Sequence, residues 1–229
     1  MASKVKSAVM LLGLAGLMVL CHMAGMKLES RMKEGETRET FKLSDKTQVI
    51  LDAGHGGIDV GKTGVNGEKE KDINLEISKK IKRFLSDSNV TVKMTREGDE
   101  RLADSQREDL KARTDIMNGG ALLAVSIHQN SYRDPAVSGA QVFYYTDSEE
   151  GRTAAGMIQA ELNALAPDNE KEIRANDSYY ILKNTRIPTV IVECGFLSSY
   201  TEAEKLADDE YQNRIAEAVS EGILQYITD

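Results

Sequence analysis

The sequence has no excess of positive charge, which excludes one large class of partner. It contains 29 lysines and arginines against 37 aspartates and glutamates, a net charge of −8 at pH 7. A protein that binds nucleic acid neutralises phosphates with a basic patch or stripe, and no such stripe is present. We therefore expect no nucleic-acid partner.

Cysteine and proline are also scarce. The two cysteines are Cys21, inside an apolar N-terminal stretch, and Cys194, at the end of an apolar run far along the chain. Cysteines in such different surroundings are not expected to pair, so the fold does not depend on a disulfide framework. There are only three prolines. No segment of the sequence repeats, which excludes a repeat architecture.

The longest hydrophobic run lies at the N-terminus, from Ala8 to Met26. At about 1.5 Å per residue, a helix of this length roughly spans a bilayer. Small residues are poorly placed there for signal cleavage. We therefore predict a signal anchor or transmembrane segment at residues 1–26, a polar linker at 27–46, and a folded domain at 47–229. Export segments of this kind would place the folded domain on the extracytoplasmic face of the membrane.

Within the folded domain, strand-like and helix-like patterns alternate. Apolar runs predict strands at 48–52, 90–94, 122–127, 140–145, 179–182 and 189–192, and helical spacing predicts helices at 72–85, 106–118, 150–165 and near the C-terminus. This alternation predicts an α/β fold. We expect a single domain in which a mostly parallel, twisted sheet of about six strands carries helices on both faces.

Side chains that suit a metal site follow three of these predicted strands. His55 and His128, two of only three histidines, each follow an apolar run, and Glu193 follows a third. In open α/β sheets, ligands bind outside the carboxyl ends of the strands, so we expect the three side chains to share a site. Two imidazoles and at least one carboxylate suit zinc. Catalytic zinc takes three protein ligands and keeps one position open, so a ligand besides His55 and His128 is needed.

The third ligand is expected from the polar loop before the helix at 72–85. Glu68, Glu70 and Asp72 all lie there, and spacing alone does not choose among them. Acidic residues before a helix are also ordinary capping features. Glu193 suggests a different role, because an acid at the end of an apolar strand is costly to bury unless it is paired or near a cation. Beside a metal it can act as a general base.

Four motifs occur in order along this domain: DAGHGG at 52–57, EKDINL at 70–75, SIHQN at 126–130 and VECGFLS at 192–198. Together they resemble the zinc-dependent N-acetylmuramoyl-L-alanine amidases of bacterial cell-wall metabolism. The likeness extends from about residue 47 to 227, so it implies that the folded domain is a catalytic amidase domain. The implied reaction is hydrolysis of the amide between N-acetylmuramic acid and L-alanine in peptidoglycan.

The resemblance also assigns roles to residues. It implies that His55, Glu70 and His128 bind zinc and that Glu193 is the catalytic acid and base. We further expect Asn130 to bind substrate or to hold its own loop.

Two other matches and two departures lie outside these assigned residues. Arg113 and Asn118 match a family helix pattern with a structural role. Ala53 stands where the family commonly has proline, and Ser199 stands where it usually has asparagine.

The segment between Asn130 and Gly139 is too short for the site-blocking helix that some relatives carry. We therefore expect an open groove, controlled by location, expression or a partner protein. The compact, anchored form resembles the subgroup that acts on spore-cortex peptidoglycan, where removal of the stem peptide precedes muramic lactam formation. A regulatory lipoprotein partner would fit that subgroup.

Two other readings compete with an amidase. A zinc exopeptidase or a carbohydrate deacetylase could use a similar α/β scaffold, although the absence of a His-Glu-x-x-His motif excludes thermolysin-type metalloproteases. A non-catalytic wall-binding scaffold on an amidase fold would show damage among the four key residues, and all four are intact.

Overall fold

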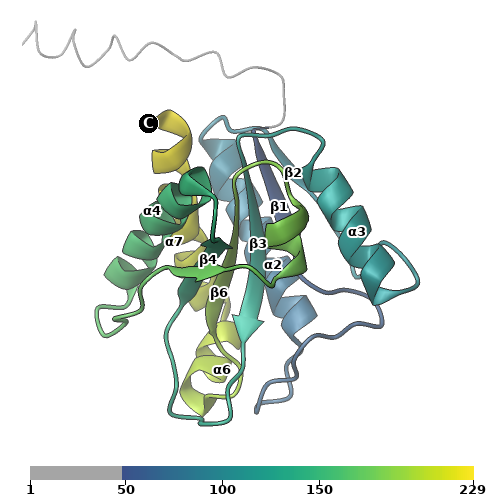
Figure 1. Ribbon diagram of the computed structural model, residues 1–229. Helices are drawn as coiled ribbons and strands as arrows, with labels where there is room; N and C mark the ends of the chain where they lie inside the picture. The colour runs from purple at the N-terminus through teal and green to yellow at the C-terminus, as the bar shows by residue number, and fades with distance from the viewer. Residues whose placement is uncertain (1–47) are drawn as a thin grey trace, which may run out of the picture. The chain divides into compact units, whose positions relative to one another are not determined.

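The computed structural model describes residues 48–229 (Figure 1). The predicted membrane segment at 1–26 and the linker at 27–46 lie outside the described residues. Within residues 48–229, no helix combines the length and the apolar character needed to cross a bilayer.

Strands and helices alternate along most of the described chain, as the pattern predicts. The elements are β1 (Val49–Ala53), α2 (Glu70–Asp87), β2 (Val92–Met94), α3 (Gln106–Met117), β3 (Leu123–Asn130), β4 (Gln141–Tyr145), α4 (Glu149–Leu165), β5 (Arg174–Asn176), α5 (Tyr180–Asn184), β6 (Thr189–Phe196), α6 (Tyr200–Ala207) and α7 (Asp209–Thr228).

The strands form one six-stranded sheet in the order β2-β1-β3-β6-β4-β5. The pairs β1–β2, β1–β3 and β3–β6 are parallel, whereas β4 runs antiparallel to β6 and carries β5 parallel to itself. The sheet is therefore mixed, with its parallel part in the order β2-β1-β3-β6. Because β1, β3 and β6 run in the same direction, their carboxyl ends meet at one edge, where ligand sites form in such sheets.

Alternate side chains of the central strands enter two cores on opposite faces of the sheet. Val49 and Leu51 face the core shared with α2, α4 and α7, whereas Ile50 faces a smaller core shared with α3 and α5. Figure 1 shows α4 and α7 on one side of the sheet and α3 on the other. The prediction of helices on both faces is confirmed.

The predicted strand at 179–182 is wrong, because this segment forms most of α5. The Asn176 side chain accepts hydrogen bonds from the backbone amides of Ser178 and Tyr179 (2.9 and 2.8 Å), and this turn starts the helix. A run of four apolar residues does not distinguish a strand from a short helix. The sixth strand is instead β5, whose three largely exposed residues carry no strand pattern.

Helices α4 and α7 approach closely at Gly222. A Cβ atom at position 222 would lie 2.5 Å from the Ile158 Cα, a distance that requires the backbone to shift. Gly156, on α4, has no atom within 4 Å of its Cβ position.

We predict that Gly222→Ala lowers the free energy of unfolding by about 1–3 kcal/mol, because it overpacks a rigid contact. Gly156→Ala, the matched control, should be neutral or stabilising by up to about 1 kcal/mol. Denaturant unfolding measures both. Equal effects of the two substitutions would contradict the close α4–α7 contact.

Candidate metal and catalytic site

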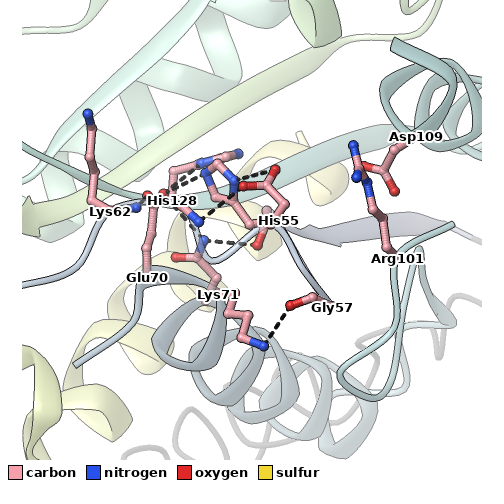
Figure 2. Close-up of polar contacts among 12 residues, drawn as sticks. His55, Gly57, Lys62, Glu70, Lys71, Arg101, Asp109 and His128 are labelled. Carbon is pink, nitrogen blue, oxygen red and sulfur yellow. Dashed lines mark hydrogen bonds and ion pairs between the residues drawn. The ribbon is translucent and has the colours of Figure 1, made fainter. Parts of the chain in front are cut away.

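Three side chains from distant parts of the sequence converge at the carboxyl edge of the sheet (Figure 2). His55 follows β1, Glu70 is the first residue of α2, and His128 lies near the end of β3. Glu70 Oε1 is 3.2 Å from His55 Nε2 and 3.0 Å from His128 Nδ1. Ligand atoms of the three residues all lie within 4.8 Å of one another, close enough to share one cation.

The position of Glu70 resolves the choice among the three acids of the loop. Glu70 is buried at 3% exposure, whereas Glu68 and Asp72 are exposed and neither belongs to the cluster. Because Glu70 opens α2, the positive end of the helix dipole also favours its charge.

The Glu70 carboxylate is held on several sides. Its oxygens accept hydrogen bonds from the backbone amides of Lys62 and Gln129, at 2.8 and 3.2 Å. Burial raises the pKa of this carboxyl, but the hydrogen bonds and charges of His128 and His55 outweigh burial and hold the pKa well below its usual range. Glu70 is therefore ionised, as a metal ligand must be.

His55 is oriented by a second carboxylate. Its Nδ1 lies 3.0 Å from Asp59 Oδ2, which leaves Nε2 directed toward Glu70. A carboxylate behind a metal-binding imidazole is a common arrangement that fixes the ring and its tautomer. Burial lowers the pKa of His55, but Glu70 and Asp59 more than compensate and raise it to about 9. A cation would therefore have to displace a proton from this ring.

A buried arginine supports the backbone that carries His55. Arg113, at 2% exposure, donates to the carbonyl oxygens of Ala53 (2.8 Å) and His55 (2.6 Å). It also pairs with Asp52 at 2.8 Å and with Asp109 at 2.7 Å. The backbone of His55 has φ +63°, a conformation that is uncommon outside glycine. The contacts agree with the structural role expected for Arg113.

Asn118, the other residue with an expected structural role, joins α3 to the loop before β6. Its amide donates to the Asn184 carbonyl oxygen (3.1 Å) and accepts from the Arg186 backbone amide (2.7 Å).

Two glycines leave space around the cluster. A Cβ atom at Gly54 would lie 2.3 Å from His128 Cε1, and one at Gly61 would lie 2.5 Å from Glu70 Oε2. Any larger residue would displace the side chain of His128 or Glu70. The two imidazoles, the ionised carboxylate and this clearance fit a zinc ion, whose usual ligands are histidine, cysteine and carboxylate.

Glu193 lies beside this cluster, paired in register with His128 across β3 and β6. Its side chain is buried at 8% exposure, and its Oε2 atom has no hydrogen-bond partner. Burial raises the pKa of Glu193 to about 7. A carboxyl group in this range can both accept and release a proton near neutral pH, which is the requirement for a general acid and base.

The cluster opens into a pocket of about 470 Å³. Its lining includes His55, Glu70, His128, Glu193 and Asn130. Asn130 Oδ1 accepts a hydrogen bond from the backbone amide of the next residue at 2.8 Å, so the side chain helps to hold its own loop. The connection from β3 to β4, residues 131–140, contains no helix, in line with the expectation that this segment is too short for a site-blocking helix.

Several supporting residues were not singled out from the sequence. They are Asp59, Asn74 and Gln129. Asn74 donates to the Gly54 carbonyl oxygen at 3.1 Å, and Gln129 donates to Asn74 at 3.2 Å, so both support the backbone next to His55 and His128. Asn74 lies four residues after Glu70 on the same helix face and inside the EKDINL motif, and Gln129 lies inside the SIHQN motif, so helical spacing and motif position were the available signals.

The chain is similar to known cell-wall amidases over nearly all of its described length. A family model described as N-acetylmuramoyl-L-alanine amidase matches residues 49–225. A germination-specific N-acetylmuramoyl-L-alanine amidase of Bacillus subtilis is 35% identical over 190 residues, covering 79% of this chain and 80% of the relative.

Solved structures show the same likeness. The CwlD amidase from Clostridioides difficile, in complex with the GerS lipoprotein, is 37% identical with a TM-score of 0.76 and covers 80% of this chain and 99% of that one. The catalytic domain of CwlV, an N-acetylmuramoyl-L-alanine amidase from Bacillus (Paenibacillus) polymyxa, is 29% identical with a TM-score of 0.72. This match covers 80% of this chain and 99% of that one.

We predict that Asp59→Asn lowers zinc affinity by about 10- to 100-fold. The neutral amide oxygen would be a weaker hydrogen-bond acceptor for His55 Nδ1 than the carboxylate, so the imidazole would be held less firmly. Glu68→Gln is the matched control, since Glu68 is an exposed acid of the same loop, and it should leave affinity unchanged. Competition titration against a chelating dye measures both. Equal affinity of the Asp59→Asn variant and the wild type would contradict this role for Asp59.

Proposed function

Because the chain belongs to the N-acetylmuramoyl-L-alanine amidase family of hydrolases, we propose that it hydrolyses the bond between N-acetylmuramic acid and L-alanine in peptidoglycan with the help of zinc. In this proposal His55, Glu70 and His128 bind the metal, and Glu193 is the catalytic acid and base. One observation supports it above all: three ligand-type side chains lie within 4.8 Å of one another beside a buried, unpaired carboxylate oxygen.

Each residue of the cluster has a defined task. When bound, zinc would polarise the scissile carbonyl group and lower the pKa of water. His55 presents Nε2 because Asp59 holds Nδ1, and Glu70 contributes a carboxylate that its hydrogen bonds keep ionised. His128 completes the set from the end of β3.

Glu193 moves the proton. In its ionised form it accepts a proton from the attacking water molecule, and it then donates that proton to the alanine nitrogen as the amide bond breaks. The proton acceptor must ionise and also give the proton back, and a pKa near 7 permits both steps. Asn130, on the pocket wall, would bind the substrate in this arrangement.

Two relatives support a proposal for the biological setting. One of them is a germination-specific amidase, and another was solved in complex with a lipoprotein. We therefore propose that this chain acts on spore-cortex peptidoglycan, where removal of the stem peptide precedes muramic lactam formation, and that a lipoprotein is its regulatory partner. Residues 1–26 would hold the domain at the extracytoplasmic face of the membrane. Loss of muramic lactam from the cortex of a deletion strain would test this setting.

We predict that the zinc-loaded chain releases an intact stem peptide from a defined muropeptide, which mass spectrometry detects. An exopeptidase would release single amino acids, and a deacetylase would release acetate. Glu193→Gln should lower kcat by about 10²- to 10⁴-fold, while zinc content stays at the wild-type level because Glu193 is not a ligand. Wild-type kcat in the Glu193→Gln variant would contradict the assignment, as would release of single amino acids or acetate by the wild type.

A further inference from the structure

The pocket beside the cluster carries one unused charge. Lys62 is the only lysine or arginine among the described residues that line it, whereas Asp59, Glu70 and Glu193 are all acidic. The Lys62 ammonium group forms no ion pair or hydrogen bond with any other residue in 48–229. The polar contacts of Lys62 are made by its backbone, whose amide donates to Glu70 Oε2 and whose carbonyl oxygen accepts from the Glu70 amide. A free cation in an otherwise acidic pocket is suited to bind an anionic group of the substrate.

The position of Lys62 is fixed even though its side chain is free. Its backbone amide donates to Glu70 Oε2 at 2.8 Å, so its Cα atom is held close to a proposed metal ligand. Figure 2 shows the side chain pointing away from Glu70 and His128. The ammonium group therefore extends outward from the reacting centre on a flexible four-carbon stem.

The other end of the pocket is apolar. Leu110, Ile181 and Ile191 line it, and all three belong to or pack on the smaller core on the α3 and α5 face. Lys62 precedes α2, which packs on the opposite face of the sheet. The pocket thus joins a cationic end on the α2 side to an apolar end on the α3–α5 side.

The proposed substrate also has an apolar half, the muramic acid, and an anionic half, the stem peptide. The muramic acid half offers methyl groups and the C–H face of a sugar ring, whereas the stem peptide offers carboxylates. An extended peptide advances roughly 3.5 Å per residue, so a carboxylate on the second stem residue lies roughly 7 Å from the scissile bond. A lysine whose backbone contacts a metal ligand is placed to reach that distance.

We propose that Lys62 is a specificity-determining residue that binds the free carboxylate on the second residue of the stem peptide, so that the stem runs toward the α2 side and the sugar toward the α3–α5 side. This inference rests on the proposed function, because it assumes the same scissile bond. It adds the direction in which the substrate lies and the charge that the enzyme selects.

A paired substrate tests the assignment. Two muropeptides are compared that differ only in whether the second stem residue carries the free carboxylate or its amide. With the full-length, zinc-loaded chain, Lys62→Gln should raise KM for the carboxylate substrate by about two- to five-fold, the range expected for an exposed ion pair. It should leave kcat unchanged, because the contact is made equally in the ground and transition states. KM for the amide substrate should stay unchanged.

Two further variants sharpen the comparison. Lys62→Arg keeps the charge and should keep the wild-type preference for the carboxylate substrate. Lys69→Gln is the matched control, since Lys69 is an exposed lysine of the same loop outside the pocket lining, and it should change neither KM. The same ratios are expected for dissociation constants measured by calorimetry in the Glu193→Gln background, in which the substrate is not consumed.

The outcomes separate the two claims. If Lys62→Gln changes KM equally for both substrates, or for neither, the assignment of Lys62 is wrong while the amidase function stands. If the wild type cleaves neither substrate at the lactyl–alanine bond, the proposed function fails and the inference fails with it.

Discussion

The carboxylate of Glu70 lies between two imidazoles because helix α2 begins where strands β1 and β3 end. Backbone amides of Lys62 and Gln129 hold its oxygens, and the positive end of the helix adds to their effect. The burial of a charge at 3% exposure is costly unless it is compensated in this way. Both histidines direct a ring nitrogen at this one compensated charge, and with it they define where a cation could bind.

A buried ion pair supports the backbone that carries His55. Asp52 and Arg113 are 1% and 2% exposed, and Arg113 also binds the carbonyl oxygens of the loop that carries His55. Removing one partner of a buried pair typically costs about 3–5 kcal/mol, because the other charge is left uncompensated. The scaffold of the site is therefore part of the stability of the domain, and the uncommon backbone conformation of His55 depends on it.

Much of this arrangement could be predicted from the sequence, but not all of it. His55, His128 and Glu193 were recognised because each follows an apolar strand, and strand ends meet at one edge. Glu70 could not be chosen by spacing, because its burial depends on where α2 begins. The direction of β4 was not predicted, since an apolar run does not record the direction of its strand. The strand predicted at 179–182 was wrong because a run of four apolar residues fits a short helix as well as a strand. The turn at Asn176 starts a helix there.

The central claim is that one zinc ion binds to nitrogen atoms of His55 and His128 and to the carboxylate of Glu70. A crystal structure of the zinc-loaded protein, with anomalous data collected at the zinc absorption edge, tests it most directly. The account predicts a single strong peak at about 2.0–2.2 Å from all three side chains, with Glu193 nearby and not bound to it. A peak elsewhere, or one that touches only one of these side chains, would contradict the account.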